Sequence, residues 1–160
     1  IEHCYNLMIK EYSVNCTNQT KPYDGIVELL DYLKAHDIKL SVFSNKADEL
    51  TKKIVAEILP DYFDAVVGLS IESLKKPNPF EALEISKNLG IKPEEMLFVG
   101  DSGIDMQTST NANMNAVGVL WGYRPEEELI ANGAKYIINH PLDLLQILDA
   151  TKKIDSGLVG

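Results

Sequence analysis

Two hydrophobic patterns alternate along the chain from about residue 24. Apolar residues three and four positions apart predict helices, and short alternating or continuous apolar runs predict strands. The expected helices cover 26–33, 50–58 and 79–89, with two more after Pro125 and Pro141, and the expected strands cover 38–43, 65–67, 96–99, 116–120 and 136–138. Each crossover between parallel strands must return over the sheet. We therefore expect an α/β fold, a three-layer, doubly wound parallel sheet with helices on both faces.

Two local patterns refine these elements. The segment 96–99 is continuously apolar, which is typical of a strand covered on both faces. Before the helix that follows residue 78, Asn78 is a candidate N-cap and Pro79 fits the first helical position. Glu81 would then complete a capping box with Asn78.

Ligands in folds of this kind bind beyond the carboxyl ends of the strands, so the residues that follow each strand are the first candidates for function. After the strand at 38–43 come Ser44, Asn45 and Lys46, which we expect to open a helix. A hydroxyl group and free backbone N–H groups at a helix N-terminus can bind an anion such as phosphate. Serine and asparagine are also ordinary N-caps, so this pattern alone leaves both interpretations open.

Two carboxylates follow the strand at 96–99. Asp101 is expected at the strand tip, and Asp105 lies four residues further on, one turn into the next helix, so both can point into one crevice. Crowded carboxylates repel each other unless a cation lies between them, and hard oxygen ligands favour Mg²⁺. The alternative is that Asp101 or Ser102 only caps the helix and Asp105 faces water.

A lysine is the third candidate group. Lys76 precedes a rigid loop with two prolines and could reach across as a point charge toward a phosphoryl group and the two carboxylates. Lys75 stands beside it, and an exposed surface lysine is the ordinary interpretation of either residue. Chemistry alone does not choose between the two.

Composition and charge narrow the possible partners. The 160 residues are 45% hydrophobic and 24% charged, which fits one globular domain. The net charge of −9 argues against a nucleic acid or an anionic membrane surface, because both bind through basic patches. No apolar run in the sequence approaches the roughly 20 residues that span a bilayer. Cys4 and Cys16 would lie about 18 Å apart on one helix, too far for a disulfide, which favours two thiols in a reducing cytoplasm.

Taken in order, these elements resemble the motifs of the haloacid dehalogenase-like hydrolase superfamily, and within it the phosphoglycolate phosphatase group. The matching segments are Ser44-Asn45-Lys46 for the second motif, Lys76-Pro77-Asn78-Pro79 for the third, Val99-Gly100-Asp101-Ser102 with Asp105 for the fourth, and Trp121-Gly122-Tyr123-Arg124, 22–33 and 62–68 for connecting stretches. The likeness runs from about residue 20 to 150. It implies that Lys76, which directly precedes the proline, is the functional lysine of the third motif.

The resemblance also implies Mg²⁺-dependent hydrolysis of a small phosphate monoester, similar to phosphoglycolate, through an aspartyl-phosphate intermediate. Asp101 and Asp105 would bind Mg²⁺. Ser44 and the Asn45 N–H would hold phosphoryl oxygens, and Lys76 would stabilise the transition state. A phosphomutase, a pyrophosphatase and a non-catalytic α/β binding domain stay open as alternatives. A dehalogenase fits less well, since that reaction needs no metal.

The chain departs from the superfamily pattern at its start. Members begin with a strand that ends in Asp-x-Asp, which carries the nucleophile and the general acid/base, and no Asp-x-Asp occurs in the 160 residues. In the superfamily that strand lies between the two strands expected here at 38–43 and 96–99. We therefore expect residues 1–18 to be the C-terminal part of a helical cap and residues 19–160 to be a core domain without its first strand. The parent protein is then expected to be longer, and this chain alone to have essentially no turnover.

Overall fold

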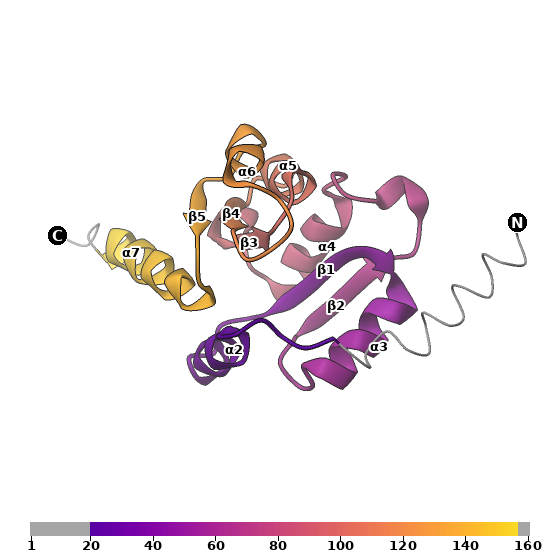
Figure 1. Cartoon of the computed structure of the whole chain (residues 1–160), viewed down its shortest axis with the longest axis horizontal. Coiled ribbons are helices and arrows are strands. Elements are labelled where there is room, and N and C mark those ends of the chain that lie inside the picture. Colours follow the sequence, from indigo (N-terminus) through magenta and orange to yellow (C-terminus); the bar gives the residue numbers. More distant parts are fainter. Residues whose placement is uncertain (1–19, 157–160) are drawn as a thin grey trace, which may run out of the picture.

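The computed structural model describes residues 20–156, and the side chains of residues 20–150 (Figure 1). In chain order the elements are α2 (Ile26–Ala35), β1 (Ser41–Ala47), α3 (Asp48–Ile58), β2 (Ala65–Leu69), η1 (Glu72–Leu74), α4 (Phe80–Leu89), η2 (Pro93–Glu95), β3 (Leu97–Gly100), α5 (Gly103–Asn111), β4 (Asn115–Val119), α6 (Glu126–Ala131), β5 (Tyr136–Ile138), η3 (Pro141–Asp143) and α7 (Leu144–Ser156), where η marks a 3-10 helix. The expected cap segment 1–18, with Cys4 and Cys16, lies outside the described residues.

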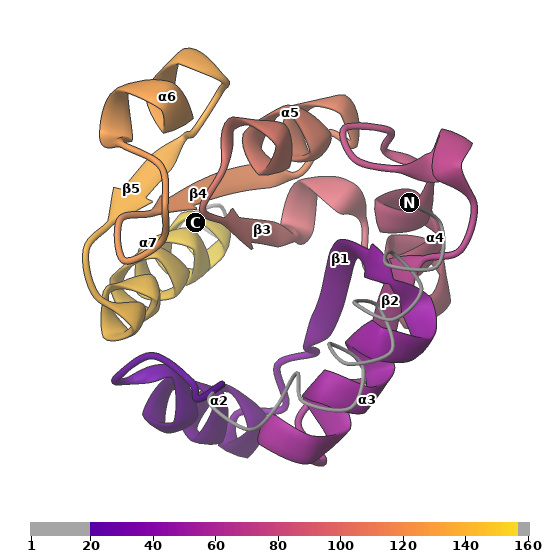
Figure 2. The same cartoon turned by 45° about the vertical axis from the view of Figure 1, so that its right-hand side comes forward.

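The strand pairs are all parallel, as the alternating pattern predicts, but they form two sheets instead of one. β1 pairs with β2, while β4 pairs with β3 on one side and with β5 on the other. Within residues 20–156, β1 and β3 are not hydrogen-bonded to each other. Figure 2 shows no other labelled strand between β1 and β3. The α/β class is therefore confirmed, and the sheet is divided between β1 and β3.

The larger sheet is covered on both faces, which gives the expected three layers. One face packs against α2 and α7, in a core of Leu29, Leu33, Val117, Val119, Ile138 and Leu144. The opposite face packs against α5 and α6, in a core of Met106, Ala116 and Leu129. Successive residues of a strand point to opposite faces, so Ala116 and Val117 of β4 belong to different cores.

The prediction that residues 96–99 form a strand buried on both faces is wrong in its second part. β3 is present, but Val99 is 44% exposed. Val99 lines two cavities, of about 280 Å³ and 380 Å³, that both extend between β1 and β3. The side chain is exposed because the edge of β3 that faces β1 has no neighbouring strand in the described residues.

The capping box predicted at the start of α4 does not form. α4 begins at Phe80 with Pro79 as its N-cap, so the prediction of Asn78 as N-cap and Pro79 as first helical residue lies one residue too early. The Asn78 side chain accepts the N–H of Phe80, at 3.0 Å, from the residue before the N-cap. However, the backbone N–H of Asn78 donates to the Lys75 carbonyl, at 3.0 Å, and is therefore not bound by Glu81. The turn before α4 uses the donor that a capping box would need.

Of the helices between residues 20 and 156, none is long and apolar enough to cross a membrane.

Candidate active site

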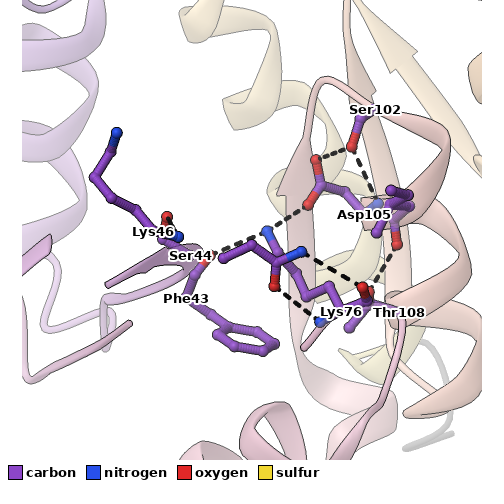
Figure 3. A network of polar contacts seen from close by, with 9 residues as sticks. Phe43, Ser44, Lys46, Lys76, Ser102, Asp105 and Thr108 are labelled. Atoms are coloured by element: carbon purple, nitrogen blue, oxygen red, sulfur yellow. Dashed lines mark hydrogen bonds and ion pairs between the residues drawn. The ribbon is translucent and has the colours of Figure 1, made fainter. Parts of the chain in front are cut away.

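Lys76 and Asp105, two of the residues singled out in the sequence, meet between β1 and β3, and Figure 3 shows the pair with Ser44, Lys46 and Ser102 nearby. Lys76 lies on the loop between η1 and α4, and its ammonium group is 2.7 Å from Oδ1 of Asp105 in the first turn of α5. Both side chains are nearly buried, with 12% and 10% of their surface exposed. The structure thus brings together two residues that are 29 positions apart.

Lys75 and Lys76 have different surroundings although they are neighbours. Lys75 pairs with Glu72 at 3.2 Å, and half of its side chain is exposed. The Lys76 ammonium also donates to the Phe43 carbonyl at 3.3 Å and lies 5.3 Å from the centre of the Phe43 ring. Lys76 is therefore the lysine that reaches Asp105, and it is held against Phe43 of β1.

The prediction that Ser44, Asn45 and Lys46 open a helix is wrong. These three residues lie in β1, and α3 begins only at Asp48, with Ala47 as its N-cap. The pairing of β1 with β2 is irregular between Phe43 and Ala47, and Ser44 Oγ accepts the N–H of Lys46 at 3.1 Å. The irregularity explains the error, because it lets the strand continue through a polar stretch that is typical of a helix start. Any anion site here is formed by a strand end instead of a helix N-terminus.

The three side chains of this stretch point in different directions. Figure 3 shows Lys46 directed away from Lys76 and Asp105. The Asn45 side chain binds the backbone of Lys76: its Oδ1 accepts the Lys76 N–H at 2.8 Å and its Nδ2 donates to the Lys76 carbonyl at 3.4 Å. The sequence did not reveal this side-chain contact, because the two residues are 31 positions apart.

A second group of contacts fixes the strand end that carries Ser44 to Lys46. Thr51 in α3 is buried, and its hydroxyl donates to the carbonyls of Lys46 and Ala47 at 3.1 and 3.0 Å. Asp48 Oδ1 accepts the N–H of Gly68 in β2 at 2.9 Å, and Oδ2 pairs with Lys52 at 2.7 Å. The hydrogen bonds from Lys52 and then Gly68 lower the pKa of the Asp48 carboxyl below its ordinary value of 3.8.

Asp105 is held on both of its carboxylate oxygens. Oδ1 accepts from Lys76, and Oδ2 accepts from the Ser102 hydroxyl at 2.6 Å. Ser102 is the N-cap of α5 and also accepts the backbone N–H of Asp105, at 3.3 Å. The alternative in which Ser102 caps the helix is therefore realised, but the part of it that placed Asp105 in water is wrong, because Asp105 is buried.

Asp101, directly after β3, is positioned by the loop that follows β4. Its Oδ2 accepts the backbone N–H of Tyr123 at 3.3 Å. A Cβ atom on Gly122 would lie 2.3 Å from both Cβ and Oδ2 of Asp101, so only glycine leaves room for the carboxylate. A Cβ on Gly100 would likewise lie 2.3 Å from Cβ of Asp105. The sequence contained these glycines, but their spacing gave no indication of which carboxylate each one contacts.

Lys76, Asp101 and Asp105 line one cavity of about 280 Å³, whose walls include residues of both β1 and β3. Two acids and one base at the carboxyl ends of parallel strands can bind a metal ion and a phosphoryl group side by side. Residues 2–119 of the chain match the family described as haloacid dehalogenase-like hydrolase. The chain belongs to this family.

Several relatives of this chain among the haloacid dehalogenase-like hydrolases are named as phosphatases. The chain is 37% identical over 141 residues to the phosphoglycolate phosphatase of Aquifex aeolicus, an alignment that covers 88% of this chain and 65% of the relative. It is 29% identical over 143 residues to the N-acetylmuramic acid 6-phosphate phosphatase of Pseudomonas aeruginosa, with 88% and 63% covered. The crystal structure of a predicted phosphoglycolate phosphatase from Haemophilus somnus matches with a TM-score of 0.78 and 28% identity, covering 86% of this chain and 61% of that one. The chain therefore spans less than two thirds of the length of these relatives.

The carboxylates of Asp101 and Asp105 could supply part of the ligand set of a magnesium ion. Carboxylate oxygens are ligands that Mg²⁺ prefers, and Asp101 and Asp105 lie at the same cavity. Asp105 already accepts short bonds on both oxygens, whereas the bond to Asp101 Oδ2 is longer. In the part of the chain that the structure describes, no three His, Cys, Asp or Glu side chains form a group that could hold a metal ion. Asp101 is thus the better candidate for direct contact with Mg²⁺, and the site needs further ligands.

Proposed function

We propose that this chain is the core of a Mg²⁺-dependent phosphatase that hydrolyses a small phosphate monoester, similar to phosphoglycolate, through an aspartyl-phosphate intermediate. The observation that carries the proposal is the nearly buried Lys76–Asp105 pair beside Asp101, at a cavity between the ends of two parallel strands. The phosphatases of Aquifex aeolicus and Pseudomonas aeruginosa, which their names assign to different phosphate esters, support the reaction class more than a particular substrate.

We assign each residue a role in this reaction. Asp101 and Asp105 would hold Mg²⁺, and Asp105 would also hold Lys76. Mg²⁺ would neutralise charge on the phosphoryl oxygens and so reduce their repulsion of an anionic nucleophile. The Ser44 hydroxyl and the Asn45 backbone N–H would bind phosphoryl oxygens at the end of β1. The Lys76 ammonium would stabilise the negative charge that develops in the transition state.

The nucleophile would come from a strand that is not among the 160 residues. We propose that this strand lies between β1 and β3, whose facing edges are otherwise unpaired within the described residues. Unpaired strand edges readily accept another strand, because their N–H and C=O groups need partners. In the same proposal, residues 19–160 are the core domain and residues 1–18 are the end of a helical cap.

The linings of the two cavities indicate what such a strand would carry. The cavity of about 380 Å³ lies among apolar side chains of α2, β3 and α7, including Leu29, Leu33 and Leu148. The other cavity contains Lys76 and the two carboxylates at the carboxyl ends of the strands. A strand parallel to β1 would therefore be apolar along its length and would end in polar residues near Lys76, which agrees with an apolar strand that ends in Asp-x-Asp.

In the proposed reaction the first Asp of that motif attacks phosphorus, and the bond from phosphorus to the ester oxygen breaks. The second Asp donates a proton to the leaving alcohol. Water, activated by the same second Asp, then attacks the aspartyl phosphate, which releases inorganic phosphate and restores the carboxylate.

The test compares the 160-residue chain with the same chain to which an apolar strand ending in Asp-x-Asp has been fused, using p-nitrophenyl phosphate with and without Mg²⁺. We expect essentially no turnover from the chain alone and Mg²⁺-dependent release of phosphate from the extended protein. An extended protein in which the first Asp of the motif is Asn is the matched control and should be inactive. Turnover by the chain alone, or a folded extended protein without any turnover, would contradict the proposal, and the second result would favour a non-catalytic binding domain.

A further inference from the structure

Two asparagine side chains hold the backbone of the loop that carries Lys76. Asn45 binds the N–H and the carbonyl of Lys76, at 2.8 and 3.4 Å. From another direction, Asn111 Nδ2 donates to the carbonyl of Pro77 at 3.0 Å. Backbone groups of two successive residues are thus bound by amides from two different elements, Asn45 in β1 and Asn111 at the last position of α5.

These contacts tie the loop to both divided parts of the sheet. β1 belongs to the sheet with β2, whereas α5 packs on β3 and β4. Asp105 and Asn111 lie on the same helix, and they bind the Lys76 side chain and the Pro77 carbonyl respectively. The loop is therefore attached to α5 through Asp105 and Asn111 and to β1 through Phe43 and Asn45, which restricts both its translation and its rotation.

A lysine side chain needs this support if its ammonium group is to stay in one place. Its four-carbon stem has many rotamers, and ordering a lysine side chain costs about 1.5–2 kcal/mol of conformational entropy. The ion pair with Asp105 fixes the far end of Lys76, but only if its α-carbon is within reach of α5. Backbone hydrogen bonds from Asn45 and Asn111 keep it there.

We infer that Asn45 and Asn111 are positioning residues, which act through the backbone of residues 76 and 77 to hold the Lys76 ammonium against Asp105. That this positioning contributes to catalysis rests on the proposed function. The hydrogen bonds that hold the loop do not depend on it. Asn111 belongs to none of the matched motifs, and an exposed asparagine at a helix end would ordinarily be taken as part of a helix terminus.

The test measures how fast the Lys76 amine is acetylated by N-hydroxysuccinimidyl acetate in the intact 160-residue chain, with mass spectrometry to resolve each lysine. Lys39 and Lys52 serve as internal references, because their side chains are more than half exposed. The variants are Asn111→Ala, Asn111→Asp, Asn111→Gln and Asn45→Ala, and the control is Asn88→Ala, an exposed asparagine at the far end of α4. The acetylation rate of Lys76 is measured without any enzymatic turnover. The test of the two asparagines therefore stays valid even if the proposed function is wrong.

We expect Asn111→Ala to accelerate acetylation of Lys76 about three- to tenfold, the effect of losing one hydrogen bond, with the reference lysines unchanged. Asn111→Asp should behave like Asn111→Ala, because a carboxylate cannot donate to the Pro77 carbonyl. Asn111→Gln keeps the amide donor and should stay within about twofold of the parent chain, and Asn45→Ala should have at least the effect of Asn111→Ala.

Two results would overturn the inference. One is an unchanged Lys76 rate in Asn111→Ala and Asn45→Ala. The other is an equal acceleration at Lys76, Lys39 and Lys52, because the asparagines would then only support the fold as a whole.

Discussion

The Lys76 ammonium and Oδ1 of Asp105 lie 2.7 Å apart, and about nine tenths of each side chain is buried, at 12% and 10% exposure. A pair in this environment is costly to break, because the group that is left behind keeps its charge without a partner. The pair also joins a loop to a helix across the divided sheet, so its loss is expected to affect stability as well as any reaction at the site.

Replacement of both partners should therefore cost less than the sum of the two single replacements. We expect Lys76→Met to lower the free energy of unfolding by about 3 kcal/mol and the double variant Lys76→Met/Asp105→Leu to cost clearly less than the sum of the single changes. Urea denaturation of the four proteins measures this coupling. Lys75→Met is the control and should stay within about 0.5 kcal/mol, since Lys75 forms only an exposed pair. Fully additive costs would show that the pair is not coupled.

Gly122 should not tolerate a side chain. A methyl group there would lie 2.3 Å from Oδ2 of Asp101, so Gly122→Ala should displace the carboxylate and lower stability by about 1–3 kcal/mol. In the strand-extended protein it should also weaken the dependence of turnover on Mg²⁺, which a Mg²⁺ titration would detect. Gly90→Ala is the control. The φ of Gly90 is 68°, which is unfavourable for alanine, but a Cβ there would have no atom within 4 Å. We therefore expect Gly90→Ala to lower the stability and to leave the Mg²⁺ titration unchanged. An unchanged Mg²⁺ titration in Gly122→Ala would contradict the role assigned to the 121–124 loop.

The contribution of Asp48 to stability should depend on pH. Its carboxyl pKa is lower in the folded chain than its ordinary value of 3.8, so the unfolded state takes up the proton first as the pH falls. The stabilisation is therefore complete well above 3.8 and is lost as the pH falls through the lower folded value. Asp48→Asn should be less stable than the parent chain at pH 7, and the difference should shrink toward pH 3, as followed by denaturation at each pH. Glu49→Gln removes one negative charge from the same turn and serves as the control; a constant difference for Asp48→Asn would refute the prediction.

Asp101 should be required for metal-dependent turnover but not for folding. In the strand-extended protein, Asp101→Asn keeps the size of the side chain and removes the charge that would bind Mg²⁺, so phosphate release should fall to background. Circular dichroism should show an unchanged fold. If Asp101→Asn is as active as the unsubstituted strand-extended protein, Asp101 is excluded as a metal ligand.

The order of the expected helices and strands and their parallel arrangement could be predicted from the sequence, because they depend on local periodicity and on the handedness of crossovers. Asp101 and Asp105 could be placed on a strand tip and one helical turn from spacing alone. The start of α3 could not be placed from the sequence, because the irregular pairing of β1 with β2 extends the strand through Ser44 to Lys46. That irregularity depends on the partner strand, which local propensity does not include.

The packed tertiary structure sets which side chains meet. It separates Lys75 from Lys76, directs Asn45 and Asn111 to the backbone of one loop, and places Gly122 against Asp101. It also divides the sheet, so that Val99, apolar in sequence, is exposed. The contacts of Asn45, Asn111 and Gly122 join residues that are far apart in the chain, and their energies depend on distances and burial that arise only when the elements pack. The sequence determines the chemical groups that are available, and packing determines which of them can act on one another.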